Sequence, residues 1–212
     1  MNFKYYIISV ISTLFLSNKL SYYLNTNEDE CVGVAPGGIP GFWNSINKIK
    51  KFDDNESFVC ASSGCLAIIS KQLTFDEIFY IANLTKYSNR SIEETKNTFI
   101  KLLVDKVTYI PDIRIYTMNV YGTCREWYLG KYIYLEHSKK LITKLLIKTT
   151  DIPYFTSDSV SFNGHYDGGL CFKFYNKCSR NIRVPKNIKF LLNSFNKDIS
   201  YEDVEYFYNF DN

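Results

Sequence analysis

A serine within a run of small residues is the part of this sequence that most directly suggests chemistry. Residues 58–66 read Phe-Val-Cys-Ala-Ser-Ser-Gly-Cys-Leu, which is typical of an apolar strand, a tight turn and the start of an apolar helix. Ser62 stands at the turn, as the serine does in a G-x-S-x-G nucleophile elbow. Strand and helix pass close together there, so the positions two before and two after the serine must be small, and they are Cys60 and Gly64. The segment therefore predicts that Ser62 is a nucleophile.

The proton of a serine hydroxyl must pass to a base before the oxygen can attack. The sequence has two histidines, His137 and His165, but no convincing Asp-then-His order of a triad follows Ser62. A carboxylate can accept the proton directly when it is held within hydrogen-bond reach of the hydroxyl. Asp167 begins an Asp-Gly-Gly sequence, at which the backbone can approach closely, and we expect this residue to be the base. The alternative is that Asp-Gly-Gly forms an ordinary hairpin turn.

Two glycines about 25 residues before Ser62 are suited to bind negative charge. Gly37 and Gly38 lie between a predicted buried strand, Cys31–Ala35, and a predicted helix, Phe42–Ile49. Successive N–H groups at the start of a helix can form a pocket for the oxyanion that develops during acyl transfer. The same turn could also cradle a phosphate or simply reverse the chain.

Taken in order, these elements resemble the patatin-like phospholipase family. That family has a glycine-rich oxyanion turn after its first strand, a G-x-S-x-G elbow, and a D-G-G or D-G-A motif that carries the aspartate of a Ser-Asp dyad. The similar stretches here are 36–41 (Pro-Gly-Gly-Ile-Pro-Gly), 60–64 (Cys-Ala-Ser-Ser-Gly) and 167–169 (Asp-Gly-Gly). A fourth, 149–155 (Thr-Thr-Asp-Ile-Pro-Tyr-Phe), resembles the x-I-P-x-x-F segment before the family's aspartate. The resemblance covers residues 31–175.

This resemblance implies a fold, a site and an activity. The fold would be a three-layer α/β/α sandwich with a mostly parallel central sheet and a nucleophile elbow. The activity would be phospholipase A-type hydrolysis of fatty-acyl esters through a covalent acyl-enzyme, with a lipid substrate at a membrane surface and no metal or cofactor. The implied site comprises the dyad Ser62 and Asp167, the oxyanion donors Gly37, Gly38 and Ser63, and the turn residues Gly41, Cys60, Gly64, Gly168 and Gly169.

Three positions depart from the family pattern. Pro36 replaces the first glycine of the G-G-G run, Pro40 replaces an Arg or Lys, and Cys60 replaces the first elbow glycine. Loss of the cation would weaken oxyanion binding or the selection of anionic lipid. None of the three changes removes a group that the dyad needs, so we expect an active enzyme. The alternatives are a catalytically inactive patatin-fold protein that binds a membrane or a partner, and a soluble esterase with His137 or His165 as the base.

Strands that alternate with helices indicate an α/β domain able to position these residues. Thr74 with Glu77, and Ser91 with Glu94, form capping boxes that predict two helix starts. The other predicted elements are strands at Ser57–Ala61, Ile113–Val120 and Trp127–Leu135 (the last a hairpin partner), helices at Gly64–Lys71 and Ser138–Thr149, a loop at Asn163–Leu170 that enters a strand, and a last amphipathic helix from Asp198.

The length and composition of the chain limit the number of domains that it can form. The chain has 212 residues, 46% hydrophobic and 22% charged, which suits one globular domain. Its formal charge of +3 argues against a nucleic-acid binder. We expect residues 1–30 to be an apolar N-terminal segment with a polar spacer, 31–197 to be the catalytic domain, and 198–212 to be an acidic, aromatic C-terminal tail.

The apolar run Tyr5–Leu16 gives information about the cellular location of the protein. It is short for a membrane span and near the length of a signal-peptide h-region. We therefore expect a signal peptide or anchor, and a protein that is membrane-associated or in the secretory pathway. A buried first helix in a cytoplasmic protein is the alternative.

The six cysteines and a basic stretch leave two further questions open. The cysteines form no C-x-x-C pair, and with two histidines they argue against a zinc site. Their even number permits disulfides, and Cys171 with Cys178 would close a short loop, but free cysteines are equally compatible. The basic stretch Lys177–Lys197 could rest on an anionic membrane or form a solvated face.

Overall fold

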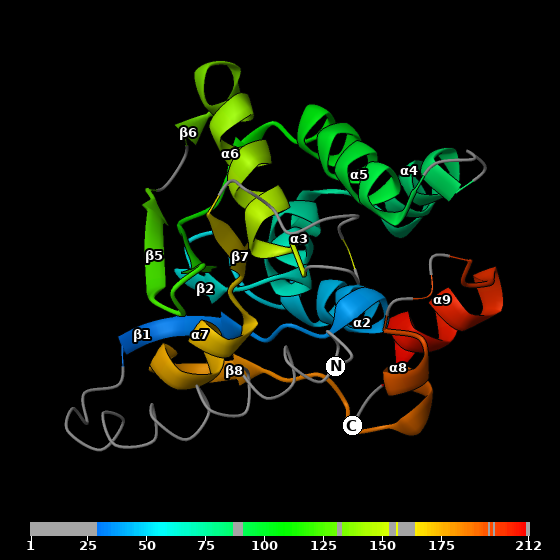
Figure 1. The fold of residues 1–212 in the computed structure, drawn as a ribbon. Helices are drawn as coiled ribbons and strands as arrows, with labels where there is room; N and C mark the ends of the chain where they lie inside the picture. Colours follow the sequence, from blue (N-terminus) through cyan, green and yellow to red (C-terminus); the bar gives the residue numbers. More distant parts are fainter. Residues whose placement is uncertain are drawn as a thin grey trace, which may run out of the picture.

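The computed structural model describes residues 29–86, 91–130, 133–152, 156, 164–194, 196 and 198–210. These residues form a mixed α/β domain whose main sheet has the order β5-β4-β2-β1-β8, with β7 paired to β4 (Figure 1). Three pairings, β8–β1, β1–β2 and β2–β4, are parallel, whereas β5 and β7 run antiparallel to β4. The strands of this sheet are β1 (Asp29–Val34), β2 (Phe58–Cys60), β4 (Ile113–Asn119), β5 (Cys124–Leu129), β7 (His165–Asp167) and β8 (Cys178–Ile182). A second, two-stranded sheet pairs β3 (Tyr109–Ile110) with β6 (Ile133–Tyr134).

Several helices begin where the sequence predicts a cap. The Ser91 hydroxyl accepts the Glu94 N–H while the Glu94 carboxylate accepts the Ser91 N–H, so the predicted capping box is confirmed. The pair Thr74 and Glu77 makes the equivalent reciprocal bonds. The helices are α2 (Gly38–Ile49), α3 (Ser63–Ile69), α4 (Phe75–Lys86), α5 (Ile92–Lys106), α6 (Leu135–Thr149), α7 (Gly169–Tyr175), α8 (Ile188–Leu192) and α9 (Tyr201–Asn209), with a 3-10 turn at Ser70–Gln72.

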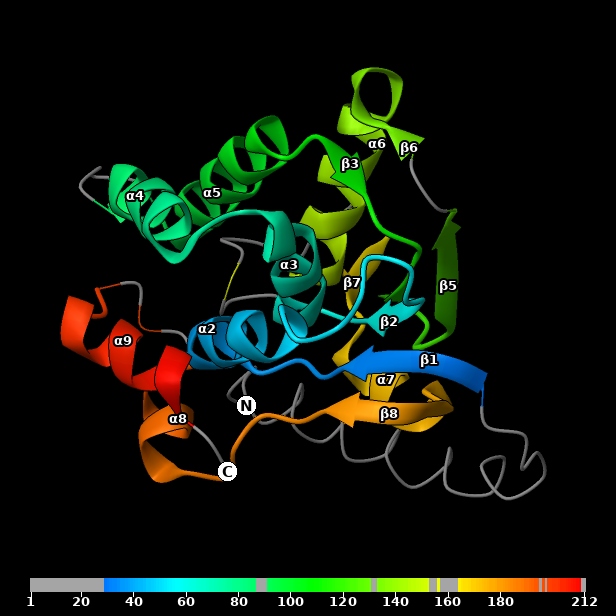
Figure 2. The same ribbon diagram turned by 180° about the vertical axis from the view of Figure 1, so that it is seen from behind.

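The two faces of the main sheet are buried by different clusters, because successive side chains of a strand point to opposite faces. α7 lies in front of β1 and β8 in Figure 1 and behind them in Figure 2, where α3 faces the viewer. We call the side that packs against α2, α3, α5 and α6 the larger face; its strand residues are Val32, Val34, Phe58, Cys60, Ile113 and Ile115. The side that packs against α7 is the smaller face; its buried cluster is Cys31, Val59, Ala61, Tyr116, Cys171, Phe172 and Cys178.

The C-terminal segment packs into the larger cluster. Val204 and Phe207 of α9 are buried there, and the Asn44 side-chain amide donates to the carbonyls of Phe207 and Phe210 at 3.0 and 2.7 Å. The amphipathic helix predicted from Asp198 is therefore confirmed. It lies beside α2 as part of the domain core (Figures 1 and 2).

Two predictions about local structure are wrong. The strand expected after residues 163–170 is helix α7, and the strand β7 comes before Gly168 instead. The hairpin partner of β4 ends at Leu129, because Ile133–Tyr134 pairs with β3 in the second sheet. The possible disulfide between Cys171 and Cys178 is not formed, because Cys178 pairs with Cys31 and Cys171 with Cys124.

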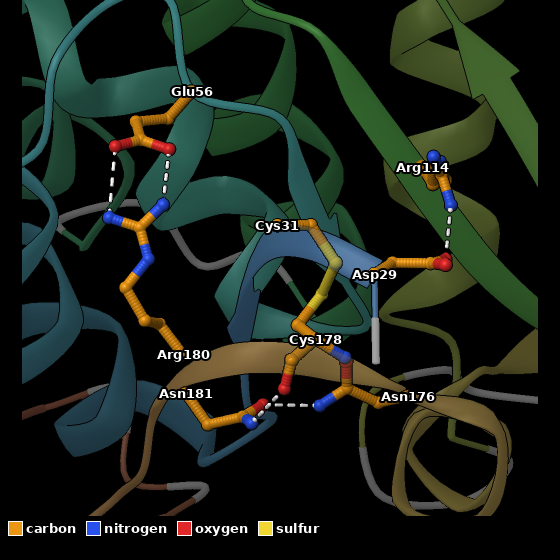
Figure 3. The surroundings of a disulfide bond; sticks show 8 residues. All are labelled: Asp29, Cys31, Glu56, Arg114, Asn176, Cys178, Arg180 and Asn181. Atoms are coloured by element: carbon orange, nitrogen blue, oxygen red, sulfur yellow. Dashed lines mark hydrogen bonds and ion pairs between the residues drawn. A yellow bond between two sulfur atoms is a disulfide. The ribbon is translucent and has the colours of Figure 1, made fainter. Parts of the chain in front are cut away.

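The six cysteines form three disulfides, one of which joins two neighbouring strands. They join Cys31 to Cys178, Cys60 to Cys65 and Cys124 to Cys171. Cys178 lies on β8, which pairs with β1, and Figure 3 shows the bond that joins these two strands. The strands of the main sheet that come first and last in the sequence are thereby linked covalently.

The membrane-related predictions fall mainly outside the described residues. Residues 1–28, which contain most of the expected N-terminal segment, and residues 153–155 of the fourth family-like stretch are not among them. Of the helices that are described, none has the length and apolar character needed to span a bilayer.

Candidate active site

Strands β2 and β7 meet end to end along one edge of β4. Cys60, the last residue of β2, lies opposite Ile115, and Asp167, the last residue of β7, lies opposite Thr117. Since β5 occupies the other edge of β4 over this stretch, both strands must lie on the same edge. β2 runs parallel to β4 and β7 runs antiparallel to it, so the C-terminal ends of these two strands point toward each other. Two residues along a strand span about 7 Å, and this geometry brings together the ends of β2 and β7.

A threonine fills the gap between the two strand ends. The Thr149 hydroxyl donates to the Tyr116 carbonyl at 2.7 Å and accepts the Ser62 N–H at 2.9 Å. Thr149 is the last residue of α6 and is fully buried. On the other side of the gap, a Cβ on Gly168 would lie 1.9 Å from the same carbonyl, so only glycine fits there. Thr149 was not among the predicted site residues, although it opens the fourth family-like stretch.

The backbone of Ser62 is strained in the manner of a nucleophile elbow. Its φ of 54° and ψ of −135° make it the one non-glycine residue with a positive φ in the described part of the chain. Such a conformation costs about 1–3 kcal/mol and persists only where its surroundings impose it. Those surroundings include the close approach of Gly64, where a Cβ would lie 2.4 Å from the Val34 carbonyl. They also include the Cys60–Cys65 disulfide, which joins the two sides of the turn.

Asp167 is held so that one carboxylate oxygen remains without a normal hydrogen bond. Its Oδ1 accepts the Gly169 N–H at 2.6 Å, and its own N–H donates to the Asp151 carbonyl at 2.9 Å. Oδ2 is buried and has no hydrogen-bond partner of standard geometry among the described residues. Burial raises the pKa of Asp167 to about 6, against the lowering effects of the Ser62 hydroxyl, the Gly169 N–H and the Lys96 ammonium. A carboxylate with this pKa is suited to accept a proton near neutral pH.

Two of the three expected oxyanion donors are free. The Gly37 N–H donates to Ser63 Oγ at 2.9 Å. The N–H groups of Gly38 and Ser63, at the starts of α2 and α3, have no acceptor among the described residues. Gly41 fits closely under the same turn, because a Cβ there would lie 2.9 Å from Val184 Cγ2.

Five of these residues line one cavity of about 480 Å³, within the usual range for small-molecule sites: Gly37, Gly38, Ser62, Ser63 and Asp167. In its described wall, Lys96 and Asp167 are the only charged side chains. Most of the others are apolar, and they come from α2, α3, α4, α5, α8, α9 and the segment before α9: Ile39, Phe42, Trp43, Leu66, Phe79, Ala82, Ile92, Phe99, Leu191, Ile199 and Val204.

No protein-family model and no curated protein sequence matches this chain. The assignment of a function therefore depends on the geometry of the site.

Neither histidine is placed to act on Ser62. His165 Nδ1 lies 3.2 Å from the Thr117 hydroxyl, and its ring packs edge-on against Trp127, outside the cavity wall. Burial, with Lys148 and Arg125 nearby, lowers its pKa. His137 lies in the first turn of α6, twelve residues before Thr149. At 1.5 Å per residue, that is about 18 Å along the helix from the end that touches Ser62.

Part of the predicted basic stretch is neutralised by ion pairs. The Arg180 guanidinium binds both oxygens of the Glu56 carboxylate, as Figure 3 shows, and Lys189 lies 2.6 Å from Asp203. Three apolar side chains of the same stretch are instead largely exposed on α8: Ile188, Leu191 and Leu192.

Proposed function

We propose that this protein is a serine acyl hydrolase that cleaves fatty-acyl esters of lipids, with Ser62 as nucleophile and Asp167 as base. The observation that carries the proposal is a convergence in one apolar cavity. The strained Ser62, the buried Asp167 with its raised pKa, and Gly38 and Ser63, whose N–H groups have no acceptor among the described residues, all line it.

The acylation step uses these groups in sequence. Asp167 accepts the Ser62 proton while the serine oxygen attacks the ester carbonyl carbon. The N–H groups of Gly38 and Ser63 stabilise the tetrahedral oxyanion. The carbon–oxygen bond to the alcohol part then breaks, and Asp167 returns the proton to the departing alkoxide. The products of this step are the free alcohol or lysolipid and an acyl ester on Ser62.

Deacylation repeats the step with water. Asp167 takes a proton from water, the hydroxide attacks the acyl-enzyme carbonyl, and Ser62 leaves with the proton that Asp167 held. The fatty acid is released and the enzyme returns to its starting state. Ser62, Asp167 and the two N–H donors return to their starting state at the end of the cycle.

A lipid substrate is supported by the character of the cavity and its surroundings. Its wall is mostly apolar, which suits an acyl chain. Leu191 lines the cavity and is 70% exposed, and Ile188 and Leu192 extend the same apolar surface on α8. A membrane surface would bury these side chains while an acyl chain enters. Three disulfides are typical of an oxidising compartment and support the proposed secretory or membrane-associated location.

The patatin-like fold is part of the same proposal. Two observations support a three-layer sandwich: a mostly parallel sheet, and helices against both of its faces. Thr149, the first residue of the family-like stretch 149–155, places its hydroxyl between the two strand ends, which gives the start of that stretch a structural role.

One observation favours a second function, a lipid- or partner-binding module without catalysis. The Gly37 N–H is occupied by Ser63 Oγ, so the oxyanion site has one donor fewer than the resemblance implies. Such a module would keep the cavity but would not activate Ser62.

A fluorophosphonate probe separates the two functions. An activated serine displaces fluoride from phosphorus and gains the mass of the phosphonyl group. We expect one adduct by intact-mass spectrometry on the wild type, none on Ser62→Ala, and a slower reaction for Asp167→Asn.

The adjacent Ser63→Ala variant is the matched control. It removes a neighbouring hydroxyl and frees the Gly37 N–H, so it should still be labelled. If folded wild-type protein gains no adduct, the binding module replaces the hydrolase.

A further inference from the structure

We propose that residues 149–151 act as a clamp that sets the separation of Ser62 and Asp167, and that Lys96 locks this clamp from the cavity wall. The inference rests on the proposed dyad and adds positioning residues to it. The proposed mechanism uses none of these residues directly, since each acts through the nucleophile or the base.

The clamp is a short piece of chain that contacts both members of the dyad. The Thr149 hydroxyl accepts the Ser62 N–H at 2.9 Å. Two residues further along, the Asp151 carbonyl accepts the Asp167 N–H at 2.9 Å. Nucleophile and base come from distant parts of the sequence, but the backbone N–H of each is held by the same piece of chain. The length of that piece therefore sets the distance between their backbones.

Residues 149–151 are fixed on both sides. Toward the N-terminus, the Asp151 N–H donates to the Lys148 carbonyl at 3.2 Å, which continues the end of α6. Toward the C-terminus, the Thr156 hydroxyl donates to the Thr150 carbonyl at 2.6 Å. All three residues of the clamp are buried. A segment held in this way has little freedom to relax, so it can fix the position of the groups that it contacts.

Lys96 reaches the clamp from α5, which packs against α6. Its Nζ lies 3.3 Å from Asp151 Oδ1, and the two side chains are 12% and 8% exposed. A buried ion pair adds little net stability over apolar residues of similar size, whereas the loss of one partner is costly. Lys96 belongs to a cavity wall that is otherwise mostly apolar. We therefore assign the pair to holding Asp151, and with it the carbonyl that binds the base.

The contact between Ser62 and Asp167 can be measured without catalysis, through the titration of the Asp167 carboxyl. Burial raises the pKa of this group to about 6, the Ser62 hydroxyl, the Gly169 N–H and the Lys96 charge lower it, and the Asp151 charge raises it. Because the hydroxyl bonds to the ionised form, Ser62→Ala should raise the titration midpoint by about one pH unit. The size of this rise measures how closely the hydroxyl is held to the carboxylate.

NMR of isotope-labelled aspartate carboxyl groups follows the titration, with Asp167→Asn to assign the signal. In Thr149→Val, which has the same shape but no hydroxyl, Ser62→Ala should cause little further rise. Thr149→Ser keeps the hydroxyl and should restore the full rise. Thr117→Val is the matched control, because the Thr117 hydroxyl is also buried but accepts the Trp127 indole N–H at 2.8 Å. It should keep the full rise.

The same titration tests the ion pair. Lys96→Arg keeps the pair and should keep the full rise on Ser62→Ala. Lys96→Met with Asp151→Asn removes the pair without leaving a buried charge, and the rise should then be smaller. Since Ser62→Ala is compared within each background, the direct effect of the lysine charge on the Asp167 carboxyl cancels. This double variant leaves the threonine in place, so it also tests the clamp if Thr149→Val does not fold.

Three results would overturn the proposal. No rise on Ser62→Ala in the starting protein would mean that the two side chains are not in contact. A full rise in Thr149→Val would remove the clamp, and a full rise in Lys96→Met with Asp151→Asn would remove the lock. These titrations involve no turnover, so a wild type that the fluorophosphonate does not label would refute the proposed function and leave the clamp standing.

Discussion

The larger and smaller faces of the sheet are stabilised by different means. On the larger face, Val32, Phe58 and Ile113 pack into a continuous apolar cluster with residues of several helices, α9 among them. On the smaller face, α7 covers a short cluster that contains the Cys31–Cys178 disulfide and reaches Cys124–Cys171. Where little apolar surface is buried, covalent links take over part of the stabilisation.

This difference explains where the cavity is found. A large apolar cluster can tolerate a cavity and a strained residue such as Ser62, because its remaining contacts still fix the backbone. The cavity accordingly lies among the helices of the larger cluster, whereas the smaller cluster is cross-linked. The third disulfide, Cys60–Cys65, belongs to the larger cluster and lies at the elbow. The three predictions below test this division of roles.

The largest expected effect is the loss of the Cys31–Cys178 disulfide. This bond spans a sequence separation of 147 residues, and the chain-entropy model assigns such a loop up to about 5 kcal/mol. Cys31→Ala with Cys178→Ala should lower the free energy of unfolding, measured in urea, by an amount of that order. The fluorophosphonate labelling rate of the protein that remains folded should not change. A slower rate would mean that the smaller face also shapes the site.

Asp167→Asn should raise stability at neutral pH while it abolishes hydrolysis. The pKa of Asp167 is raised in the folded state, so the folded protein binds more protons than the unfolded chain between pH 4 and 6. Stability is therefore lost as the pH rises through this window. At about 1.4 kcal/mol per pKa unit, the ionised carboxylate destabilises the fold by up to about 3 kcal/mol above pH 6.

Urea unfolding of Asp167→Asn and wild type at pH 3.5 and pH 7 would measure this difference. Asparagine cannot ionise and can still accept the Gly169 N–H, so the gain should appear at pH 7 and vanish at pH 3.5. The wild-type labelling rate should fall as the pH decreases below about 6. A variant less stable than wild type at pH 7 would contradict the buried-carboxylate interpretation.

The smallest effect on stability is expected for the elbow disulfide. Cys60 and Cys65 are five residues apart, for which the chain-entropy model gives about 2 kcal/mol. Their joint replacement by alanine should nonetheless slow fluorophosphonate labelling, because the turn that strains Ser62 can then relax. Unchanged labelling would show that Gly64 and Thr149 impose the elbow alone. The variant without the Cys31–Cys178 disulfide is the comparison, because it should lose more stability and yet keep its labelling rate.

Local sequence signals predicted the elements that depend on neighbours along the chain. The elbow follows from the small residues around Ser62, and two helix starts follow from their capping boxes. These features need only a few consecutive residues, so they can be recognised without knowledge of the fold.

Contacts between distant segments could not be predicted in this way. Cys178 pairs with Cys31 because β8 lies beside β1, and no local pattern indicated that β8 exists. The hydrogen bond from Gly37 to Ser63 Oγ depends on how closely α2 and α3 approach. Likewise, the Thr149 hydroxyl acquires its role only when the ends of β2 and β7 meet at Tyr116.

The end-to-end meeting of β2 and β7 has a consequence for biosynthesis. Ser62 and Asp167 are 105 residues apart, and neither strand end is complete without β4 between them in the sequence. During synthesis, which proceeds from the N-terminus, the serine leaves the ribosome long before its base exists. Under the proposed function, a nascent chain therefore carries the nucleophile without its base, and hydrolysis of lipid esters can begin only after translation has passed Asp167.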